Sequence, residues 1–137
     1  MKPGILVLCT GNSARSQMGE GLFRHYLGDR FEVSSAGTRP SSVRQEAVAV
    51  MAELGIDLTG HRSKSVEEFL DREFRYVFTV CDQAKESCPL FPGQAERIHW
   101  SLEDPAAVEG SWEERTAAFR EIRDQLRERV IKFAKTV

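Results

Sequence analysis

The chain has 137 residues, of which 41% are hydrophobic and 29% charged, a composition typical of one soluble globular domain. Its 19 basic and 21 acidic residues leave a net charge of -2, which favours neither nucleic acid nor a membrane surface as a partner. No apolar stretch approaches the roughly 20 residues that span a bilayer. The three cysteines are an odd number without a recognisable secretory signal, so we expect a cytoplasmic protein with reduced thiols. We also expect a monomer.

The first third of the chain predicts a strand, a helix and a second strand. Residues 5–9 form a continuous apolar run, which is typical of a buried strand. Residues 18–27 place apolar side chains at helical spacing, and Gly28 is suited to end that helix. Residues 31–35 then alternate as in a strand, which Gly37 closes.

Capping signals predict two further helices. Ser42 with Gln45 fits a capping box, in which each side chain accepts a hydrogen bond from a free backbone N–H group. Apolar residues at helical spacing follow, and Gly55 stands where the residue after a helix belongs. Ser65 with Glu68 repeats the signal for a shorter helix.

The remaining chain predicts two more strands and a long terminal helix. Residues 76–81 are apolar and β-branched, as in a central parallel strand, and residues 98–100 suggest a shorter one. Ser111 and Glu114 form a capping box ahead of an apolar stripe that contains Trp112, Phe119, Ile122, Leu126, Val130, Phe133 and Val137. Strands alternating with helices predict one α/β domain over 1–137, a three-layer sandwich with a four-stranded, mostly parallel central sheet. Its ligand site is expected at the carboxyl ends of the strands.

The loop between the first strand and helix carries the sharpest chemical signal, a cysteine and an arginine separated by five mostly small residues. Small residues let successive N–H groups turn toward one tetrahedral oxyanion, and Arg15 can bind two of its oxygens. The partial positive charges of these N–H groups and the charge of Arg15 also favour the thiolate of Cys9 as a nucleophile, to which Ser16 can donate a further hydrogen bond. The alternative is a buried cysteine beside an exposed arginine, which the flanking strand and helix disfavour. The predicted oxyanion-binding residues are Thr10, Gly11, Asn12, Ser13, Ala14 and Arg15.

Two more cysteines follow the predicted central strand. Cys81 ends it, and Cys88 stands seven residues later, before Pro89. If this strand lies beside the first, Cys81 emerges next to the loop, and the segment 82–87 can swing Cys88 in and out. The pattern then indicates a relay of three thiols, against the alternative of two structural cysteines.

Asp104, followed by Pro105, is a candidate general acid. Its carboxyl group can face the oxyanion loop from the opposite side, although Asp-Pro is also frequent in plain turns. His25, His61 and His99 show no metal-ligand spacing with the cysteines. We therefore predict no metal site.

With these residues in place, the chain resembles the thioredoxin-coupled arsenate reductases, a redox branch of the low-molecular-weight protein tyrosine phosphatase fold. Phosphatases of this fold share the loop and the Asp-Pro pair, but they do not need the two extra cysteines and usually carry an aromatic residue where Ala106 stands. The likeness spans nearly the whole chain and is carried by Leu8 to Ser13, Arg15 to Met18, Ser35-Ala36-Gly37, Gly55-Ile56-Asp57, Cys81, Cys88-Pro89, His99-Trp100 and Asp104-Pro105.

The resemblance implies a sequence of roles. Cys9 attacks arsenate held by Arg15 and the loop amides, Ser16 stabilises the thiolate, and Asp104 protonates the departing oxygen. Cys81 then attacks the Cys9 adduct and arsenite leaves. Cys88 takes Cys81, which leaves a Cys81–Cys88 disulfide for thioredoxin. No cofactor is implied.

One position departs from the pattern of the family. Some members bind potassium, and Asn12, Glu20 and Ser35 match that site, but Lys64 stands where an acidic residue is expected. The resemblance therefore suggests that the ammonium group of Lys64 replaces the cation. The alternative is a solvated surface lysine. Ala14 stands where some relatives carry a fourth, nonessential cysteine.

Two other functions stay open. The chain can be a phosphatase that hydrolyses phosphate monoesters through a Cys9 phosphoenzyme, or a noncatalytic oxyanion sensor. Cys81 and Cys88 discriminate between reductase and phosphatase, because ester hydrolysis does not need them. A sensor would need neither Asp104 nor the relay.

Overall fold

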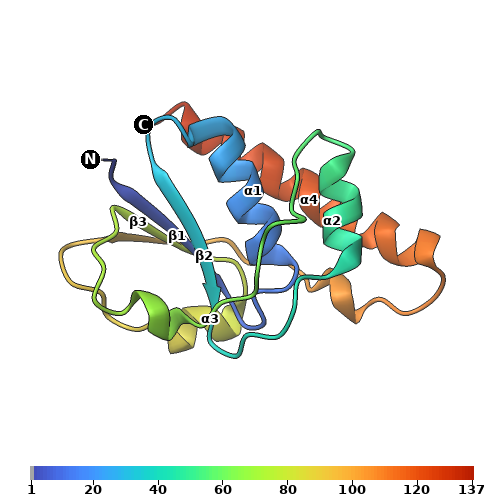
Figure 1. The fold of residues 1–137 in the computed structure, drawn as a ribbon, viewed down its shortest axis with the longest axis horizontal. Helices are drawn as coiled ribbons and strands as arrows, with labels where there is room; N and C mark the ends of the chain where they lie inside the picture. Colours follow the sequence, from blue (N-terminus) through green and yellow to red (C-terminus); the bar gives the residue numbers. More distant parts are fainter. Residues whose placement is uncertain (1) are drawn as a thin grey trace.

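The protein is described by a computed structural model that covers residues 2–137. Within that range, four strands form one sheet in the order β2-β1-β3-β4, and every pair is parallel (Figure 1). The predicted fold class is thereby confirmed. The elements in chain order are β1 (Gly4–Cys9), α1 (Arg15–Leu27), β2 (Glu32–Gly37), α2 (Gln45–Ala52), the 3-10 helix η1 (Val66–Phe69), β3 (Tyr76–Thr79), α3 (Asp82–Ser87), β4 (Glu96–His99), the 3-10 helix η2 (Pro105–Ala107) and α4 (Trp112–Ala134).

Strand β1 is the centre of the molecule. All six of its residues are buried, because it pairs with β2 on one side and β3 on the other and is covered on both faces. The register sets Cys9 opposite Gly37 and Leu8 opposite Thr79. The last residue of β1 is therefore held firmly at the carboxyl edge of the sheet.

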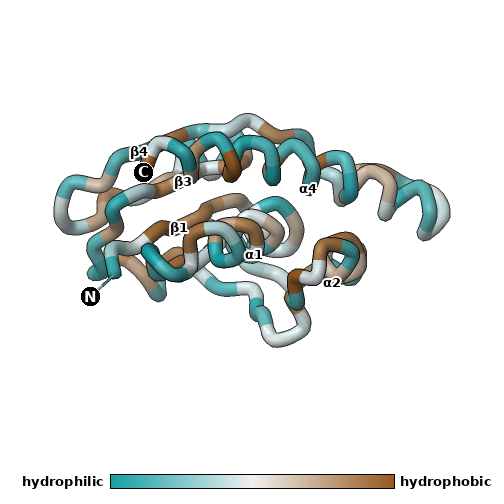
Figure 2. Tube along the Cα trace, turned by 90° about the horizontal axis from the view of Figure 1, so that it is seen from above, coloured by the Kyte–Doolittle hydropathy of each residue, from teal (hydrophilic) through white to brown (hydrophobic). Residues whose placement is uncertain are grey.

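Helices α1 and α4 cover one face of the sheet (Figure 1). The ring of Phe78 on β3 lies 4.6 Å from that of Phe23 on α1 and 5.0 Å from that of Phe133 on α4. Thr79, the next residue along β3, points to the opposite face, where α3 lies. Figure 2 shows β1 as mostly hydrophobic and α4 as alternating between hydrophobic and hydrophilic turns, as expected for a central strand and an amphipathic outer helix.

The capping box of α4 is confirmed, because Ser111 accepts a hydrogen bond from the backbone of Glu114 and the Glu114 side chain accepts one from Ser111. Trp112 departs from the predicted stripe, since 43% of it is exposed. Further along, Arg120 and Arg123 bind Glu53, which follows α2, at 2.6 and 2.7 Å. These bonds lower the pKa of Glu53 to about 2.

The capping box predicted at Ser42 and Gln45 is wrong. Helix α2 begins at Gln45, after Arg44, and no side chain caps it. The preceding segment is extended because its backbone is bound to the loop after β1, with N–H groups of Ser41 and Arg44 donating to carbonyls of that loop. Gly55 does follow the helix with a positive φ of 75°, which suits a residue without a side chain.

Several boundaries also differ from the prediction. Strand β3 ends at Thr79, so Cys81 is no strand residue but caps α3, which the sequence pattern did not predict as a helix. Strand β4 ends before Trp100. Ser65 caps η1 through the backbone of Glu67, without a reciprocal bond from Glu68, whose carboxylate instead binds Arg62. Among residues 2–137, no helix is long and apolar enough to cross a membrane.

Candidate active site

A small pocket of about 240 Å³ opens at the carboxyl edge of the sheet, above the end of β1. Parallel α/β sheets place ligand sites at this edge. The pocket brings together the oxyanion loop, the candidate acid and one residue of α3. Its lining residues are Cys9, Thr10, Gly11, Ser13, Ala14, Arg15, Gln83 and Asp104.

The thiol of Cys9 is surrounded by hydrogen-bond donors. The backbone N–H of Asn12 donates to Cys9 Sγ at 3.2 Å, and Ser16 Oγ lies 2.8 Å from the same sulfur. The amide Nδ2 of Asn12 donates to Ser16 Oγ, so the hydroxyl proton of Ser16 is free to point at the sulfur. Both contacts can therefore direct a hydrogen toward the sulfur of Cys9.

Asn12 holds the loop in its turned shape. Its φ of 47° is the one positive value at a non-glycine residue in the range 2–137. Its side-chain oxygen accepts from the backbone N–H of Lys64 at 2.8 Å and from Gln17 at 3.0 Å, which fixes Nδ2 as the donor toward Ser16. The loop is therefore braced from inside before any anion binds.

Gly37 lets β2 pass directly beneath the loop. A Cβ atom at this position would lie 2.5 Å from the carbonyl oxygen of Thr10 and 2.9 Å from the backbone nitrogen of Asn12. Both contacts are with backbone and cannot move aside without deforming the loop. A glycine is therefore required at this close approach.

Arg15 and Asp104 face the pocket from two different segments. Arg15 Nη1 donates to the carbonyl of Leu102 at 2.9 Å, and Nη2 lies 3.9 Å from Asp104 Oδ2. The other carboxylate oxygen of Asp104 accepts from the backbone of Ala106 and caps η2. Asp104 is thus fixed at the rim of the pocket, with Oδ1 bound to the backbone and Oδ2 on the side of Arg15.

Cys81 lies beside the loop, because β3 is the neighbour of β1. Its Sγ is 3.3 Å from Thr10 Oγ1, and it accepts from the backbone of Ala84 at 3.4 Å. Thr10 donates its proton to Gln83 Oε1, so toward Cys81 it acts as the acceptor. Sequence reasoning missed Gln83, whose place in the pocket depends on the undetected helix α3.

Cys88 is half-buried at the far end of α3. Burial raises the pKa of its thiol, and the guanidinium of Arg97 opposes part of that rise. The six residues of α3 lie between Cys81 and Cys88. At the helical rise, these seven steps put the two Cα atoms about 10 Å apart, whereas a disulfide needs roughly 4 to 7 Å. The structure therefore keeps these two thiols apart, and bonding them requires α3 to unwind.

Lys64 is not a solvated surface residue. Its Nζ lies 3.4 Å from Glu20 Oε1, and its side chain is only 13% exposed. Ser35 donates to the same carboxylate oxygen at 2.6 Å and accepts from Asn12 Nδ2. The same Nδ2 donates to Ser16, which contacts Cys9, so a continuous chain of hydrogen bonds connects Glu20 with Cys9. Burial favours the neutral acid, but the bond from Ser35 and the nearby basic groups outweigh it and lower the pKa of Glu20.

The histidines have other partners. His61 lies between Gln17 and Glu20, and His99 bridges Thr79 and Asp82. Across the described chain from residue 2 onward, no group of three or more His, Cys, Asp or Glu side chains is arranged to hold a metal ion.

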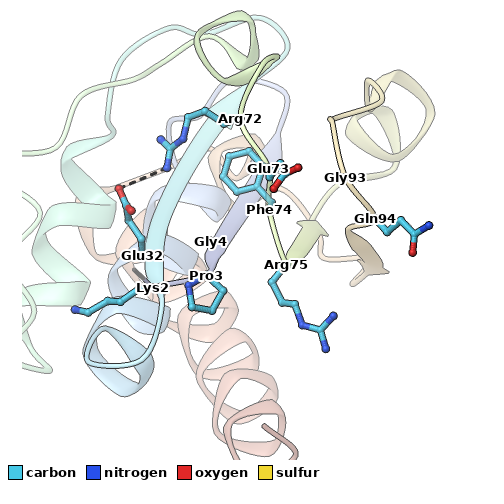
Figure 3. Close-up of a pocket in the computed structure, with 10 residues that line it drawn as sticks. All are labelled: Lys2, Pro3, Gly4, Glu32, Arg72, Glu73, Phe74, Arg75, Gly93 and Gln94. Atoms are coloured by element: carbon cyan, nitrogen blue, oxygen red, sulfur yellow. Dashed lines mark hydrogen bonds and ion pairs between the residues drawn. The ribbon is translucent and has the colours of Figure 1, made fainter.

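A larger hollow of about 770 Å³ lies at the opposite, amino-terminal edge of the sheet (Figure 3). Its charged side chains are of both signs, and Arg72 pairs with Glu32 at 3.5 Å. It holds no thiol or other strong nucleophile among its lining residues. Of the residues predicted to be catalytic, Cys9, Arg15 and Asp104 line the smaller pocket.

Comparisons with known proteins agree with this geometry. The family description "Low molecular weight phosphotyrosine protein phosphatase" matches residues 4–137. An arsenate reductase of Halalkalibacterium halodurans is 44% identical over 135 residues, which cover 98% of this chain and 97% of the relative. A solved arsenate reductase in the oxidized state is 32% identical with a TM-score of 0.82, over 99% of this chain and 98% of that one. A thioredoxin-dependent arsenate reductase of Corynebacterium glutamicum is 26% identical with a TM-score of 0.75, over 98% of this chain and 60% of its own.

Proposed function

The chain belongs to the low-molecular-weight phosphotyrosine protein phosphatase family, and from that premise we propose that it reduces arsenate to arsenite with Cys9 as the nucleophile. The observation that carries this proposal is the contact of 3.3 Å between Cys81 and Thr10, which puts a second thiol at the wall of the oxyanion loop. Ester hydrolysis has no use for that thiol. A reaction that moves two electrons from thiols to arsenic requires it.

In the first step, arsenate binds to the loop amides and the guanidinium of Arg15, and the thiolate of Cys9 attacks arsenic. An S–As bond forms and an As–O bond breaks. Asp104 protonates the leaving oxygen, which departs as water. Ser16 and the backbone of Asn12 hold the sulfur as a thiolate before the attack.

In the second step, the thiolate of Cys81 attacks the sulfur of Cys9. The Cys9–Cys81 disulfide forms, and the electron pair of the S–As bond stays on arsenic, which leaves as arsenite. The two thiols are thereby oxidised and As(V) is reduced to As(III). Thr10 accepts a hydrogen bond from the Cys81 thiol in the resting state and so orients it toward the loop.

In the third step, the thiolate of Cys88 attacks Cys81, and Cys9 leaves as a thiolate ready for another arsenate. This exchange moves the disulfide to Cys81–Cys88 without a net change in oxidation state. A dithiol protein of the thioredoxin type then reduces that disulfide. The similarity to a thioredoxin-dependent reductase supports this choice of electron donor.

A second activity follows from the same loop. A phosphate monoester fits the cradle as arsenate does, Cys9 can form a phosphoenzyme, and Asp104 can protonate the leaving alcohol. The family description favours this side activity. Ala106 follows the Asp-Pro pair, and its small side chain offers little contact to an aromatic ring, so we expect the ester hydrolysis to be slow.

The decisive experiment is an NADPH-coupled assay with thioredoxin and thioredoxin reductase, run with arsenate, and a parallel assay with p-nitrophenyl phosphate. Cys9→Ser is expected to abolish both activities, because a hydroxyl is protonated at neutral pH. Cys81→Ser and Cys88→Ser should lose repeated turnover of arsenate but keep ester hydrolysis. Full arsenate turnover by either variant would contradict the relay, and equal loss of both activities would contradict the division between them.

A further inference from the structure

Strand β4 holds the segment of α3 at both ends. At the start, His99 Nε2 lies 2.9 Å from Asp82 Oδ1, and its Nδ1 lies 2.7 Å from Thr79 Oγ1. At the end, Arg97 Nη2 donates to the carbonyl oxygen of Pro89 at 2.6 Å. Alternate residues of a strand point to the same face, so the two side chains extend from β4 on the same side.

The two attachments differ in strength. At the start of the helix, Asp82 also accepts from Ser101 Oγ, Gln83 bonds to Thr10, and the side chain of Ala84 is fully buried. The bond from His99 is the main cause that lowers the pKa of Asp82. The first turn, which carries Cys81, is therefore fixed to the sheet.

The far end is held more lightly. The side chains at 85–87 are exposed and make no hydrogen bond to another part of the described chain. Leu90, just beyond Pro89, is 87% exposed. The contact between Arg97 and Pro89 is the one side-chain hydrogen bond that ties the segment from 85 to 90 to the sheet within residues 2–137.

We propose that Arg97 is a positioning residue for Cys88, which holds this thiol away from Cys81 through the carbonyl of Pro89 and releases it for the third step of the relay. The proposal rests on the reductase function where it names that step. On release, α3 unwinds from its lightly held end while Asp82 and His99 keep Cys81 in place. The thiolate of Cys88 then forms a bond to Cys81 Sγ, and the bond from Cys81 to Cys9 breaks.

Arg97 has a second, separable effect on the same thiol. Its guanidinium lowers the pKa of Cys88 against the larger effect of burial. In the closed state, removing the side chain takes away this lowering of the pKa, but release of Cys88 to solvent takes away the larger effect of burial, so a variant that exposes Cys88 is expected to ionise at lower pH. A measurement of reactivity against pH separates the two, because the plateau at high pH reports access and the midpoint reports ionisation.

The test uses the full-length protein with Cys9→Ser and Cys81→Ser, so that Cys88 is its remaining thiol, and measures alkylation by iodoacetamide from pH 7 to 11. Arg97→Gln keeps an amide donor, but its side chain ends two atoms short of the Nη2 position that reaches the carbonyl of Pro89. It is expected to raise the plateau rate by roughly three- to tenfold, the effect of losing one hydrogen bond to the closed state. Arg97→Lys, which can still donate, should stay near the parent. Arg75→Gln removes a second exposed arginine, which lies two residues before the β3 position paired with Arg97, and serves as the charge-matched control.

A plateau for Arg97→Gln that matches the control would overturn the proposal, whether or not the protein reduces arsenate. The relay itself is tested by adding arsenate to protein with all three cysteines, in the absence of a reductant, and following the Cys81–Cys88 disulfide by quenching and mass analysis. Arg97→Gln should form it faster at a pH above the midpoint. An unchanged or slower rate would show that Arg97 does not hold Cys88 back.

Discussion

Replacing Lys64 by aspartate tests whether its ammonium group stands in for a bound cation. The Nζ atom lies 3.4 Å from the carboxylate of Glu20, and both side chains are largely buried. At that separation and an effective dielectric constant of about 20, the attraction is about 5 kcal/mol. Arg24 and His61 remain beside Glu20, so we expect Lys64→Asp to lower the free energy of unfolding by about 2 to 4 kcal/mol in the absence of potassium.

The assay is urea unfolding at constant ionic strength in potassium or sodium chloride. Lys64→Asp is expected to regain stability and apparent arsenate affinity with potassium but not with sodium. In this variant, the carboxylates of the introduced aspartate and of Glu20 face the space that the ammonium group of Lys64 occupied. Lys64→Met is the matched control, since it removes the charge without adding a ligand and should respond to neither ion. The parent should also show no specific response to potassium.

The pH dependence gives an independent check. The pKa of Glu20 is lowered in the folded protein, so its contribution to stability is present above the unfolded value of about 4.5 and is lost as the pH falls through the folded value. Removing Lys64 should move that loss to higher pH. A parent protein that gains stability with potassium specifically, or a Lys64→Asp variant indifferent to both ions, would refute the substitution of cation by ammonium.

Two further predictions concern Asp104 as the general acid and the ion pairs by which Glu53, after α2, binds α4. Asp104→Asn should slow the first step of arsenate reduction by a factor of about 10² to 10⁴, or 2.7 to 5.5 kcal/mol, with little change in oxyanion affinity; an unaltered single-turnover rate would remove Asp104 as the acid. Glu53→Gln should lower the urea midpoint at pH 7, where the ion pairs with Arg120 and Arg123 are present. Because the folded pKa of Glu53 is about 2 and the unfolded value is 4.5, the gap between parent and variant should close as the pH falls from 4.5 toward 2, and a constant gap would contradict this origin.

The oxyanion loop could be predicted because its chemistry is local. Seven consecutive residues, Cys9 to Arg15, supply the nucleophile, the turn and the guanidinium, and a strand followed by a helix fixes where they lie. The sheet was predictable for a similar reason, since crossover rules leave few arrangements for alternating strands and helices. The pairing of β3 with β1, on which the place of Cys81 depends, follows from those rules only as one option.

The parts that escaped prediction depend on contacts between distant segments. The carbonyl of Leu102 accepts from Arg15, and that of Pro89 accepts from Arg97. Every residue has a backbone carbonyl, so the sequence does not show which one will accept a distant side chain. The false capping box at Ser42 arose because the backbone before α2 is bound to the oxyanion loop instead of starting a helix. A capping pattern states a local preference, which tertiary hydrogen bonds can override.

Helix α3 has only six residues, and helices of that length are not stable without tertiary contacts. If the relay works by unwinding it, this weakness is a requirement of turnover, and the protein faces a trade-off between heat resistance and speed at this segment. Substitutions that strengthen α3 would yield a more durable but slower enzyme. An engineer seeking thermal tolerance would do better to change α2 and α4, which contain none of the three cysteines of the relay.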